Sequence, residues 1–358
     1  MRDRSMVKMA VVAHEDHHRR MSETMRRLEL LFVIDPLEVL ILETETSLLM
    51  MGEAARRGHA NFVAHDRDLY LRDREPRARA RSIEVDESAR PFWRLGAVVD
   101  RPVTSFDVVL LRKDPPVDTA YMTLLALLSP ARHDVPVVND PDGIRRSNEK
   151  LLPLEIPDAW VPTVVTADPE VVAAFVREHE EVVVKPLNEF SGRGIFRLSI
   201  RDTTLDADAV GALAANRGRH VMVQRFLPEV TRGDKRVFVL DGEPVGWVNR
   251  IPRVGSFRAN IHQGASVERT ELTDREREIV AAARGLLCER GLAMTGFDFI
   301  GEHLTEINVT SPSAVRQINQ VMGIRLETTL VDWLEGRAEE RGRPAAAGRP
   351  RVIGKAES

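Results

Sequence analysis

The chain has 358 residues, enough for two or three structural units that each have a hydrophobic core. A formal net charge of −4 and a pI near 6.2 exclude a global basic field of the kind that holds nucleic acid or an anionic membrane. An anionic ligand would therefore need a local cluster of Arg and Lys.

Cys288 is the single cysteine, which excludes an intrachain disulfide. It lies in an apolar-periodic run, 279–292, so we expect a buried structural thiol rather than a reactive one. No run approaches the ~20 apolar residues of a membrane span. Lys and His interrupt the apolar patch near the N-terminus, which argues against a signal peptide. We expect a cytoplasmic protein.

Both ends differ in composition from the rest of the chain. Residues 1–27 are dense in Arg, His and Met and are expected to form an extension, with Met25 as a candidate start of translation. Residues 337–358 are rich in Arg, Gly, Pro and Ala, which predicts a mobile tail. His14-Glu-Asp-His-His18 formally matches the zinc-protease pattern H-E-x-x-H. A metalloprotease is therefore an alternative, which the position of the motif in the extension, outside any predicted packed helix, disfavours.

From residue 28 onward, strand-like and helix-like segments alternate, which predicts an open α/β sheet in 28–147. The strands expected there are 28–34, 61–64, 108–111 and 135–139. The helices expected are 46–57, closed by Gly58, and 120–128, and a polar turn is expected at 140–143.

Two further units follow. In 148–227 we expect Ser147 to cap a helical turn at 148–152, Asp168 and Pro169 to open a helix, and strands at 181–184 and 195–200. In 228–336 we expect a helix that begins with the capping box of Thr273 and Glu276. The strands expected in this unit are 236–240, 244–249, 295–300 and 304–309.

The last two strands predict a hairpin that carries two carboxylates. If Ile300 pairs with Leu304, Asp298 lies opposite Glu306, and Asn308 points to the same face. Facing carboxylates repel each other, and a hard divalent cation such as Mg²⁺ would compensate. The alternative is the exposed polar face of a surface hairpin, which the apolar remainder of the hairpin disfavours.

A lysine and a glycine-bearing turn point to an anionic ligand. Lys185 ends an apolar strand, where its charge would need an anionic partner. The turn that follows carries Ser191, Gly192 and Gly194 and can present backbone N–H groups to phosphate oxygens. It lacks the Walker spacing, so a simple β-turn beside a snorkelling lysine remains open. Lys150 alone would be an ordinary residue of a first helical turn.

These segments, in this order, resemble the ATP-grasp superfamily and, within it, the bacterial glutathione synthetases. The resemblance runs from about residue 28 to 334. It is carried by blocks in the following ranges: 111–116 (LRKDPP), 148–151 (NEKL), 185–187 (KPL), 233–237 (GDKRV), 241–244 (DGEP), 250–252 (RIP) and 304–312 (LTEINVTSP).

The resemblance implies a nucleotide and metal site, with ATP and Mg²⁺ and with Mn²⁺ as an alternative ion. It assigns the ATP phosphates to Lys150, Lys185, Ser191, Gly192 and Gly194. It assigns the adenine to a hinge of Gln224, Phe226 and Leu227, and the ribose to Asp234. It assigns the metal to Asp298, Glu306 and Asn308, the residues that the hairpin argument also selects.

The resemblance also implies catalytic cations and a peptide pocket. The catalytic residues would be Lys185, Arg236 and Arg250. The peptide substrate would contact Arg112, Lys113, Asp114, Ser311 and Arg316, and a closing loop would carry Arg258 and Asn260.

The family's fold is an N-terminal α/β domain, here 28–147, followed by a two-lobed ATP-grasp domain, here 148–227 and 228–336. The implied reaction begins when a carboxylate attacks the γ-phosphate of ATP, which releases ADP and forms an acyl phosphate. An amine then attacks the acyl carbon and displaces phosphate to form the amide. For this family the substrates are γ-glutamylcysteine and glycine, the product is glutathione, and the assembly is a homotetramer. We expect neither nucleic acid nor membrane as a partner.

The turn after Lys185 departs from the family pattern. It has Asn188 where the family has an acidic residue, and Glu189 and Phe190 where small or flexible residues are usual. Arg193 is an added residue in character, although the turn is not longer. The closing loop, 253–264, has also lost glycines. These changes leave two alternatives open: a ligase of the same mechanism acting on another carboxylate and amine, and a catalytically silent nucleotide-binding regulator.

Overall fold

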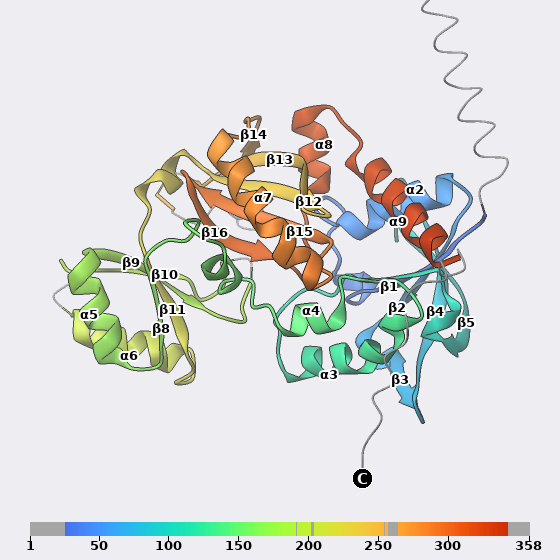
Figure 1. Ribbon diagram of the computed structural model, residues 1–358, viewed down its shortest axis with the longest axis horizontal. Helices are drawn as coiled ribbons and strands as arrows, with labels where there is room; N and C mark the ends of the chain where they lie inside the picture. The colour runs from blue at the N-terminus through green and yellow to red at the C-terminus, as the bar shows by residue number, and fades with distance from the viewer. Residues whose placement is uncertain (1–25, 191, 202–203, 254, 257–263, 343–358) are drawn as a thin grey trace, which may run out of the picture.

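The computed structural model describes residues 26–190, 192–201, 204–253, 255–256 and 264–342, which form a mixed α/β protein with three sheets (Figure 1). Several predicted features therefore lie outside the described residues: the extension up to residue 25 with the His14–His18 motif and Met25, the residues Ser191, Arg258 and Asn260, and the tail from residue 343. Within the described part of the chain, no helix is both long enough and apolar enough to cross a membrane.

The first sheet belongs to the N-terminal domain and has the order β3-β4-β2-β1-β6-β7, with β5 paired to β4. Its strands are β1 (Glu29–Val33), β2 (Ala60–Ala64), β3 (Leu69–Arg72), β4 (Glu75–Val85), β5 (Trp93–Pro102), β6 (Val108–Leu111) and β7 (Val137–Val138). Strands β2, β1, β6 and β7 are parallel, and β1 and β6 consist almost entirely of buried apolar residues, as parallel strands covered on both faces do. The helices of this domain are α2 (Thr46–Arg56), α3 (Thr119–Leu128) and α4 (Pro141–Arg145).

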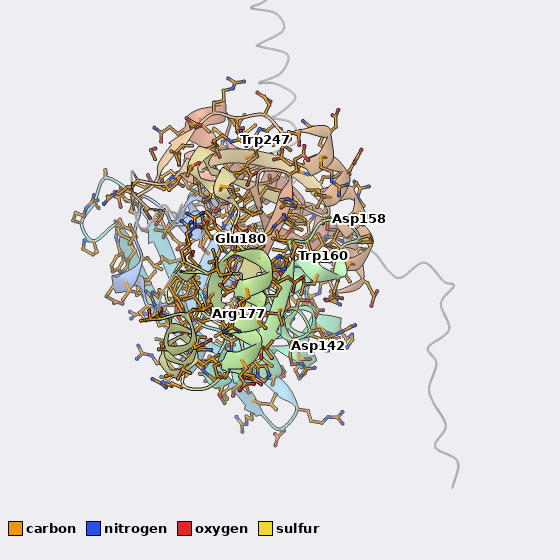
Figure 2. The ribbon with its side chains drawn as sticks, turned by 90° about the vertical axis from the view of Figure 1, so that its left-hand side faces the viewer. Asp142, Asp158, Trp160, Arg177, Glu180 and Trp247 are labelled. Carbon is orange, nitrogen blue, oxygen red and sulfur yellow. The ribbon has the colours of Figure 1, made fainter. Side chains whose placement is uncertain are left out.

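The second sheet forms the central lobe and is antiparallel, with the order β10-β9-β11-β8. Its strands are β8 (Thr163–Thr166), β9 (Glu181–Pro186), β10 (Phe196–Ser199) and β11 (Val221–Arg225). Helices α5 (Pro169–His179) and α6 (Leu205–Ala215) pack against it. The carboxylate of Asp168 caps α5 as predicted, by accepting a hydrogen bond from Glu170 N. Figure 2 faces this lobe, with Arg177 of α5 at its outer surface.

The third sheet forms the C-terminal lobe and has the order β14-β13-β12-β15-β16, antiparallel throughout. Its strands are β12 (Asp234–Leu240), β13 (Glu243–Ile251), β14 (Ser266–Glu268), β15 (Met294–Ile300) and β16 (His303–Asn308). Its helices are α7 (Asp274–Glu289), α8 (Val315–Met322) and α9 (Leu326–Gly342). The predicted capping box at the start of α7 is present: Thr273 accepts from Glu276 N, and Glu276 accepts from Thr273 N.

Short 3₁₀ helices connect these elements at Leu37–Val39, Asp66–Asp68, Val103–Ser105, Ser129–His133, Leu152–Glu155 and Pro228–Arg232. Two hydrophobic cores each contain residues of both the N-terminal domain and the C-terminal lobe. In the second of these, α9 packs against α2, so the last helix that the structure describes returns to the first domain (Figure 1). The central lobe has a separate core between α5, α6 and its own sheet.

Several predicted elements differ in the structure. Cys288 is exposed, because it lies on the solvent face of α7, so the prediction of a buried thiol is wrong. The predicted helical turn at 148–152 is present, with Leu152 N donating to Asn148 O at 2.8 Å, but the side chain that caps it is Asn148 rather than Ser147. Residues 141–143, predicted as part of a polar turn, begin α4. Helix α9 continues past the predicted start of the tail, and Arg337 within it pairs with Asp241. Strands β3, β4, β5, β8, β11 and β14 and helices α6, α8 and α9 were not predicted.

Candidate active site

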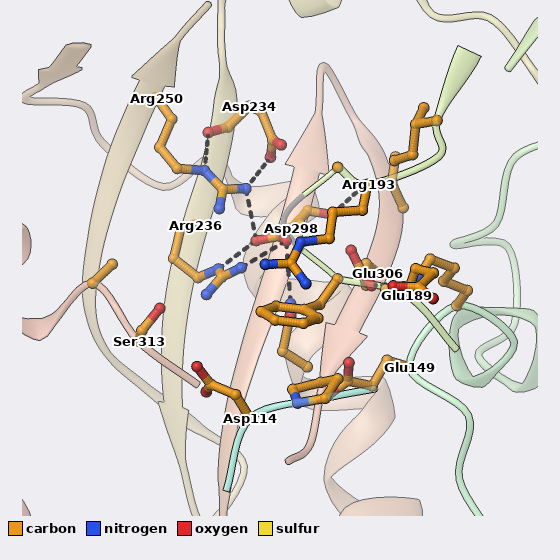
Figure 3. Close-up of a pocket in the computed structure, with 18 of the residues that line it drawn as sticks. Asp114, Glu149, Glu189, Arg193, Asp234, Arg236, Arg250, Asp298, Glu306 and Ser313 are labelled. Atoms are coloured by element: carbon orange, nitrogen blue, oxygen red, sulfur yellow. Dashed lines mark hydrogen bonds and ion pairs between the residues drawn. The ribbon is translucent and has the colours of Figure 1, made fainter. Parts of the chain in front are cut away.

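A pocket of about 670 Å³ lies where the three units meet (Figure 3). The N-terminal domain contributes Arg112 and Asp114 to its wall, the central lobe contributes Lys185 and Gln224, and the C-terminal lobe contributes the hairpin β15–β16. Most of the predicted site residues that the structure describes converge here. They are Arg112, Asp114, Lys150, Lys185, Gly192, Gln224, Phe226, Leu227, Asp234, Arg236, Arg250, Asp298, Glu306, Asn308 and Ser311.

The hairpin places Asp298 directly opposite Glu306, as predicted, and Gly296 opposite Asn308. The premise of the prediction was wrong, because Ile300 pairs with His303 and Phe299 with Leu304. A register shift between Asp298 and Phe299 restores the predicted pairing further along the strands.

Asp298 is buried and surrounded by four nitrogen atoms. Arg236 is its cross-strand neighbour on β12 and binds it through two nitrogens, with Nη2 2.9 Å from Oδ2. Arg250 Nη2 lies 3.0 Å from Oδ1, and Asn308 Nδ2 donates to Oδ2 at 3.1 Å. Gly296 leaves room for this arrangement, since a Cβ there would come within 3.3 Å of Arg236 Cδ and Nη1. The expected repulsion between facing carboxylates is therefore offset by arginines.

Arg250 joins a second carboxylate to this group. Its cross-strand neighbour is Asp234, whose Oδ1 lies 2.7 Å from Arg250 Nη2 in an ionic contact. Burial disfavours the ionised form of both carboxyls, but the charges of Arg236 and Arg250 outweigh burial at Asp298 and lower its pKa to about 2. At Asp234 burial prevails over Arg250, and the pKa is raised. The cluster thus holds two guanidinium charges beside one firmly ionised carboxylate.

Two lysines line the same pocket. Lys150 Nζ lies 3.3 Å from Glu306 Oε1 and donates to the backbone oxygen of Glu189. Lys185 Nζ donates to Gln224 Oε1 at 2.8 Å, a neutral partner. Burial lowers the pKa of Lys185, and the nearby carboxylate of Glu306 acts in the opposite direction. An anion beside Lys185 would favour its charged form.

Glu149, which we had not singled out, fixes the segment that carries Lys150. Its carboxylate accepts hydrogen bonds from Val309 N at 2.8 Å, Thr310 N at 3.0 Å and Thr310 Oγ1 at 2.8 Å. Burial and the charge of Glu306 raise its pKa. Its position between Asn148 and Lys150 in a block that resembles the family was an available signal.

The N-terminal domain supplies the opposite wall of the pocket. Arg112 is buried and donates to Pro312 O at 2.8 Å and to Ser47 Oγ at 3.3 Å. Burial lowers the pKa of Arg112. Burial first, and then the charge of Glu45, raise the pKa of Asp114 to about 7, although a hydrogen bond from Ser311 opposes the shift.

Three predicted residues lie in other positions. Lys113 sits beside the pocket, where its Nζ is 2.7 Å from Asp35 Oδ1, and Asp35 also accepts from Asp114 N. Arg316 pairs with Glu87, 2.7 Å away, rather than facing the pocket. Gly194 has a φ of +68° and lies against Pro186 at the base of its turn. The pocket wall also includes Asp35 and Glu45, which no motif singles out, and Arg193 of the altered turn after Lys185.

The donor set of the hairpin suits a hard divalent cation. Asp298, Glu306 and Asn308 bring carboxylate and amide oxygens to one pocket, the ligand chemistry that Mg²⁺ prefers. Across the described parts of the chain, no group of three or more His, Cys, Asp or Glu side chains could hold a metal, so these carboxylates would need oxygens from a substrate as well.

Comparisons with known proteins agree with this architecture. The sequence matches the prokaryotic glutathione synthetase N-terminal domain over residues 28–145 and the prokaryotic glutathione synthetase ATP-grasp domain over 149–323. A glutathione synthetase of Gloeobacter violaceus is 40% identical over 326 residues, 89% of this chain and 99% of the relative. One of Mesorhizobium japonicum is 39% identical over 311 residues, 87% and 99% of the two chains.

A solved structure of a D-cycloserine synthetase, DcsG, superposes with a TM-score of 0.60 at 15% identity, over 85% of this chain and 99% of that one, and supports the fold alone. The sequence matches confirm the resemblance drawn from the motif blocks. The chain belongs to the prokaryotic glutathione synthetase family of ATP-grasp ligases.

Proposed function

We propose that this chain joins the cysteinyl carboxylate of γ-glutamylcysteine to the amine of glycine and cleaves ATP to ADP and phosphate. The near-full-length identity to glutathione synthetases supports the substrates. The observation that carries the mechanism is the convergence of Lys150, Lys185, Arg236 and Arg250 in one pocket. These cations suit a reaction in which negative charge develops on phosphoryl and carbonyl oxygens.

The nucleotide would lie between the central and C-terminal lobes. Gln224, Phe226 and Leu227, at the end of β11, line the pocket and would receive the adenine. Lys150 and Lys185 would contact the phosphates, and the neutral partner of Lys185 leaves its charge free for them. Asp234 was expected at the ribose, but its carboxylate contacts Arg250, so we assign it to the charge cluster instead.

Asp298, Glu306 and Asn308 would hold Mg²⁺, which would neutralise phosphate charge and align the phosphates. Four nitrogens already surround the oxygens of Asp298, so a bound ion would replace at least one of these contacts. Arg236 and Arg250 would orient the attacking carboxylate and stabilise the acyl phosphate. Arg112, Asp114 and Ser311 line one wall of the pocket. They would bind the γ-glutamyl end of the peptide.

The test gives the purified protein ATP, Mg²⁺ and γ-glutamylcysteine, with and without glycine, and identifies products by mass spectrometry. We expect glutathione and one ADP per amide bond. Alanine and serine should be poor acceptors, by roughly 10–200-fold, since one methylene in a tight pocket is worth about 1–3 kcal/mol. A new amide with another amine, and none with glycine, would contradict the substrate assignment and leave the ligase class intact.

The family resemblance also leads us to propose a homotetramer that works in the cytoplasm. Sedimentation equilibrium of the purified chain tests the assembly, and a concentration-independent monomer mass would contradict it.

A further inference from the structure

The turn between β9 and β10 closes back on its own base, and its described residues Phe190, Gly192 and Arg193 line the pocket. Arg193 N donates to Phe190 O at 3.1 Å, and Ile195 N donates to Gly192 O at 3.4 Å. Gly192 and Gly194 both have positive φ, and a Cβ on Gly194 would come within 2.9 Å of Pro186 Cγ. The compact turn therefore places Arg193 at its end, between two glycines.

The base of this turn is fixed to the segment that carries Lys150. Lys150 Nζ donates to Glu189 O, and Asn148 Nδ2 donates to Leu187 O at 3.2 Å. Lys150, Glu189, Phe190 and Arg193 all line the pocket. Arg193 thus lies on the same wall as a lysine that we assign to the ATP phosphates.

The guanidinium of Arg193 is oriented by an aromatic ring. Its Cζ lies 4.6 Å from the centroid of Phe190, within the range of a cation–π contact. Figure 3 shows the Arg193 side chain pointing from the turn into the pocket, on the side where Arg236 and Asp298 lie. The ring restricts the rotamers of Arg193 and leaves the N–H edge of the guanidinium available to a ligand.

The charges of the other side chains in the pocket indicate which kind of ligand Arg193 would bind. Arg236 and Arg250 are paired with Asp298 and Asp234, and Lys150 is paired with Glu306. Among the residues that the structure describes, no carboxylate pairs with Arg193. A guanidinium presents a planar fork of donors that matches phosphate oxygens in a bidentate manner.

We propose that Arg193 is a phosphate-binding residue of this site and contacts the terminal phosphates of ATP, while Phe190 acts as its positioning residue. This inference rests on the proposed function for the presence of ATP. It adds a side-chain cation to a turn that was expected to bind phosphate through backbone N–H groups alone.

The test is isothermal titration calorimetry of the full-length protein with Mg²⁺, using AMP-PNP, ADP and AMP. For Arg193→Ala we expect the Kd of AMP-PNP to rise about 10–100-fold, the effect of losing a charge-assisted hydrogen bond. The Kd of AMP should stay within about twofold, because AMP lacks the terminal phosphates. The Kd of AMP-PNP for Arg193→Lys should lie between those of the wild type and Arg193→Ala, since lysine keeps the charge and lacks the planar fork of donors. Phe190→Leu should raise the Kd about 2–5-fold, as expected for an exposed cation–π contact.

Arg201→Ala is the matched control, because Arg201 is an exposed arginine of the same lobe outside the pocket wall, and its Kd values should equal those of the wild type. An unchanged Kd of AMP-PNP in Arg193→Ala would overturn the proposal. An equal rise in the Kd values of AMP and AMP-PNP would overturn it as well. A raised KM for γ-glutamylcysteine with normal AMP-PNP binding would instead assign Arg193 to the acyl substrate. A wild type that binds AMP-PNP but makes no glutathione would contradict the proposed function only.

Discussion

Replacing Asp298 with Asn should destabilise the fold, not only the reaction. The carboxylate balances Arg236 and Arg250 in a buried cluster. In the variant, the new amide N–H group would take the place of one carboxylate oxygen; at the Oδ2 position it would face donors from Arg236 and Asn308. Removing one partner of a buried ion pair leaves an uncompensated charge.

The magnitude follows from the pKa of Asp298, which falls from an ordinary 3.8 to about 2. That shift corresponds to about 2 kcal/mol of folding free energy at neutral pH. Breaking a buried ion pair typically costs about 3–5 kcal/mol. We therefore expect Asp298→Asn to lower the free energy of unfolding by roughly 2–5 kcal/mol. Because the folded-state pKa is depressed, the carboxylate stabilises the protein above pH ~4. The difference between wild type and variant should shrink as the pH falls from about 4 to 2.

Urea unfolding, followed by tryptophan fluorescence at pH 7, measures the loss. Glu306→Gln is the matched control, since this side chain is 26% exposed and has one ionic contact, with Lys150. We expect it to change the stability by less than about 1 kcal/mol. Equal effects of the two substitutions, or an unchanged midpoint for Asp298→Asn, would refute the reasoning.

Three further predictions concern catalysis and pH. Lys185→Ala should cost about 2–4 kcal/mol of transition-state stabilisation, seen as a fall in kcat/KM of roughly 30–1000-fold in a coupled ADP assay, and a fall below threefold would exclude a phosphate contact. Glu306→Gln should raise the Mg²⁺ concentration for half-maximal activity, and an unchanged titration would remove Glu306 from the metal site. Because burial raises the pKa of Asp114 to about 7, the folded state holds its proton more tightly than the unfolded state, and this group lowers stability as the pH rises from about 4 to 7. Asp114→Asn should therefore raise Tm more at pH 8 than at pH 4, and an equal gain at both values would contradict the burial argument.

The carboxylate hairpin was predictable because its two strands are adjacent in sequence and the turn between them is short. The register shift beside Asp298 was not, since an extra residue in one strand leaves no separate pattern. The capping box of α7 was predictable for a similar reason: Thr273 and Glu276 interact across three residues. Local chemistry of this kind is fully present in the sequence.

Strands β3, β4 and β5 were missed because their alternation is weak. On β4 the buried positions include Ala78 and Ala80, and the outward positions between and beside them are arginines, so the inward face carries little hydrophobicity. Helix α9 was not predicted, and its last turns were assigned to a tail that begins at Arg337. A contact of Arg337 with Asp241, far away in sequence, holds this end of the helix. The partners of Asp298 on β12 and β13 are likewise set by sheet order, which the sequence does not state.

The division of the hydrophobic cores has a consequence for how the protein unfolds. The N-terminal domain and the C-terminal lobe share two cores and should lose structure together, whereas the core of the central lobe is closed on itself. Amide hydrogen exchange should therefore reveal two cooperative units with different opening free energies, with the central lobe exchanging first. A nucleotide that touches both units would raise the protection of the weaker one and bring the two opening free energies closer together.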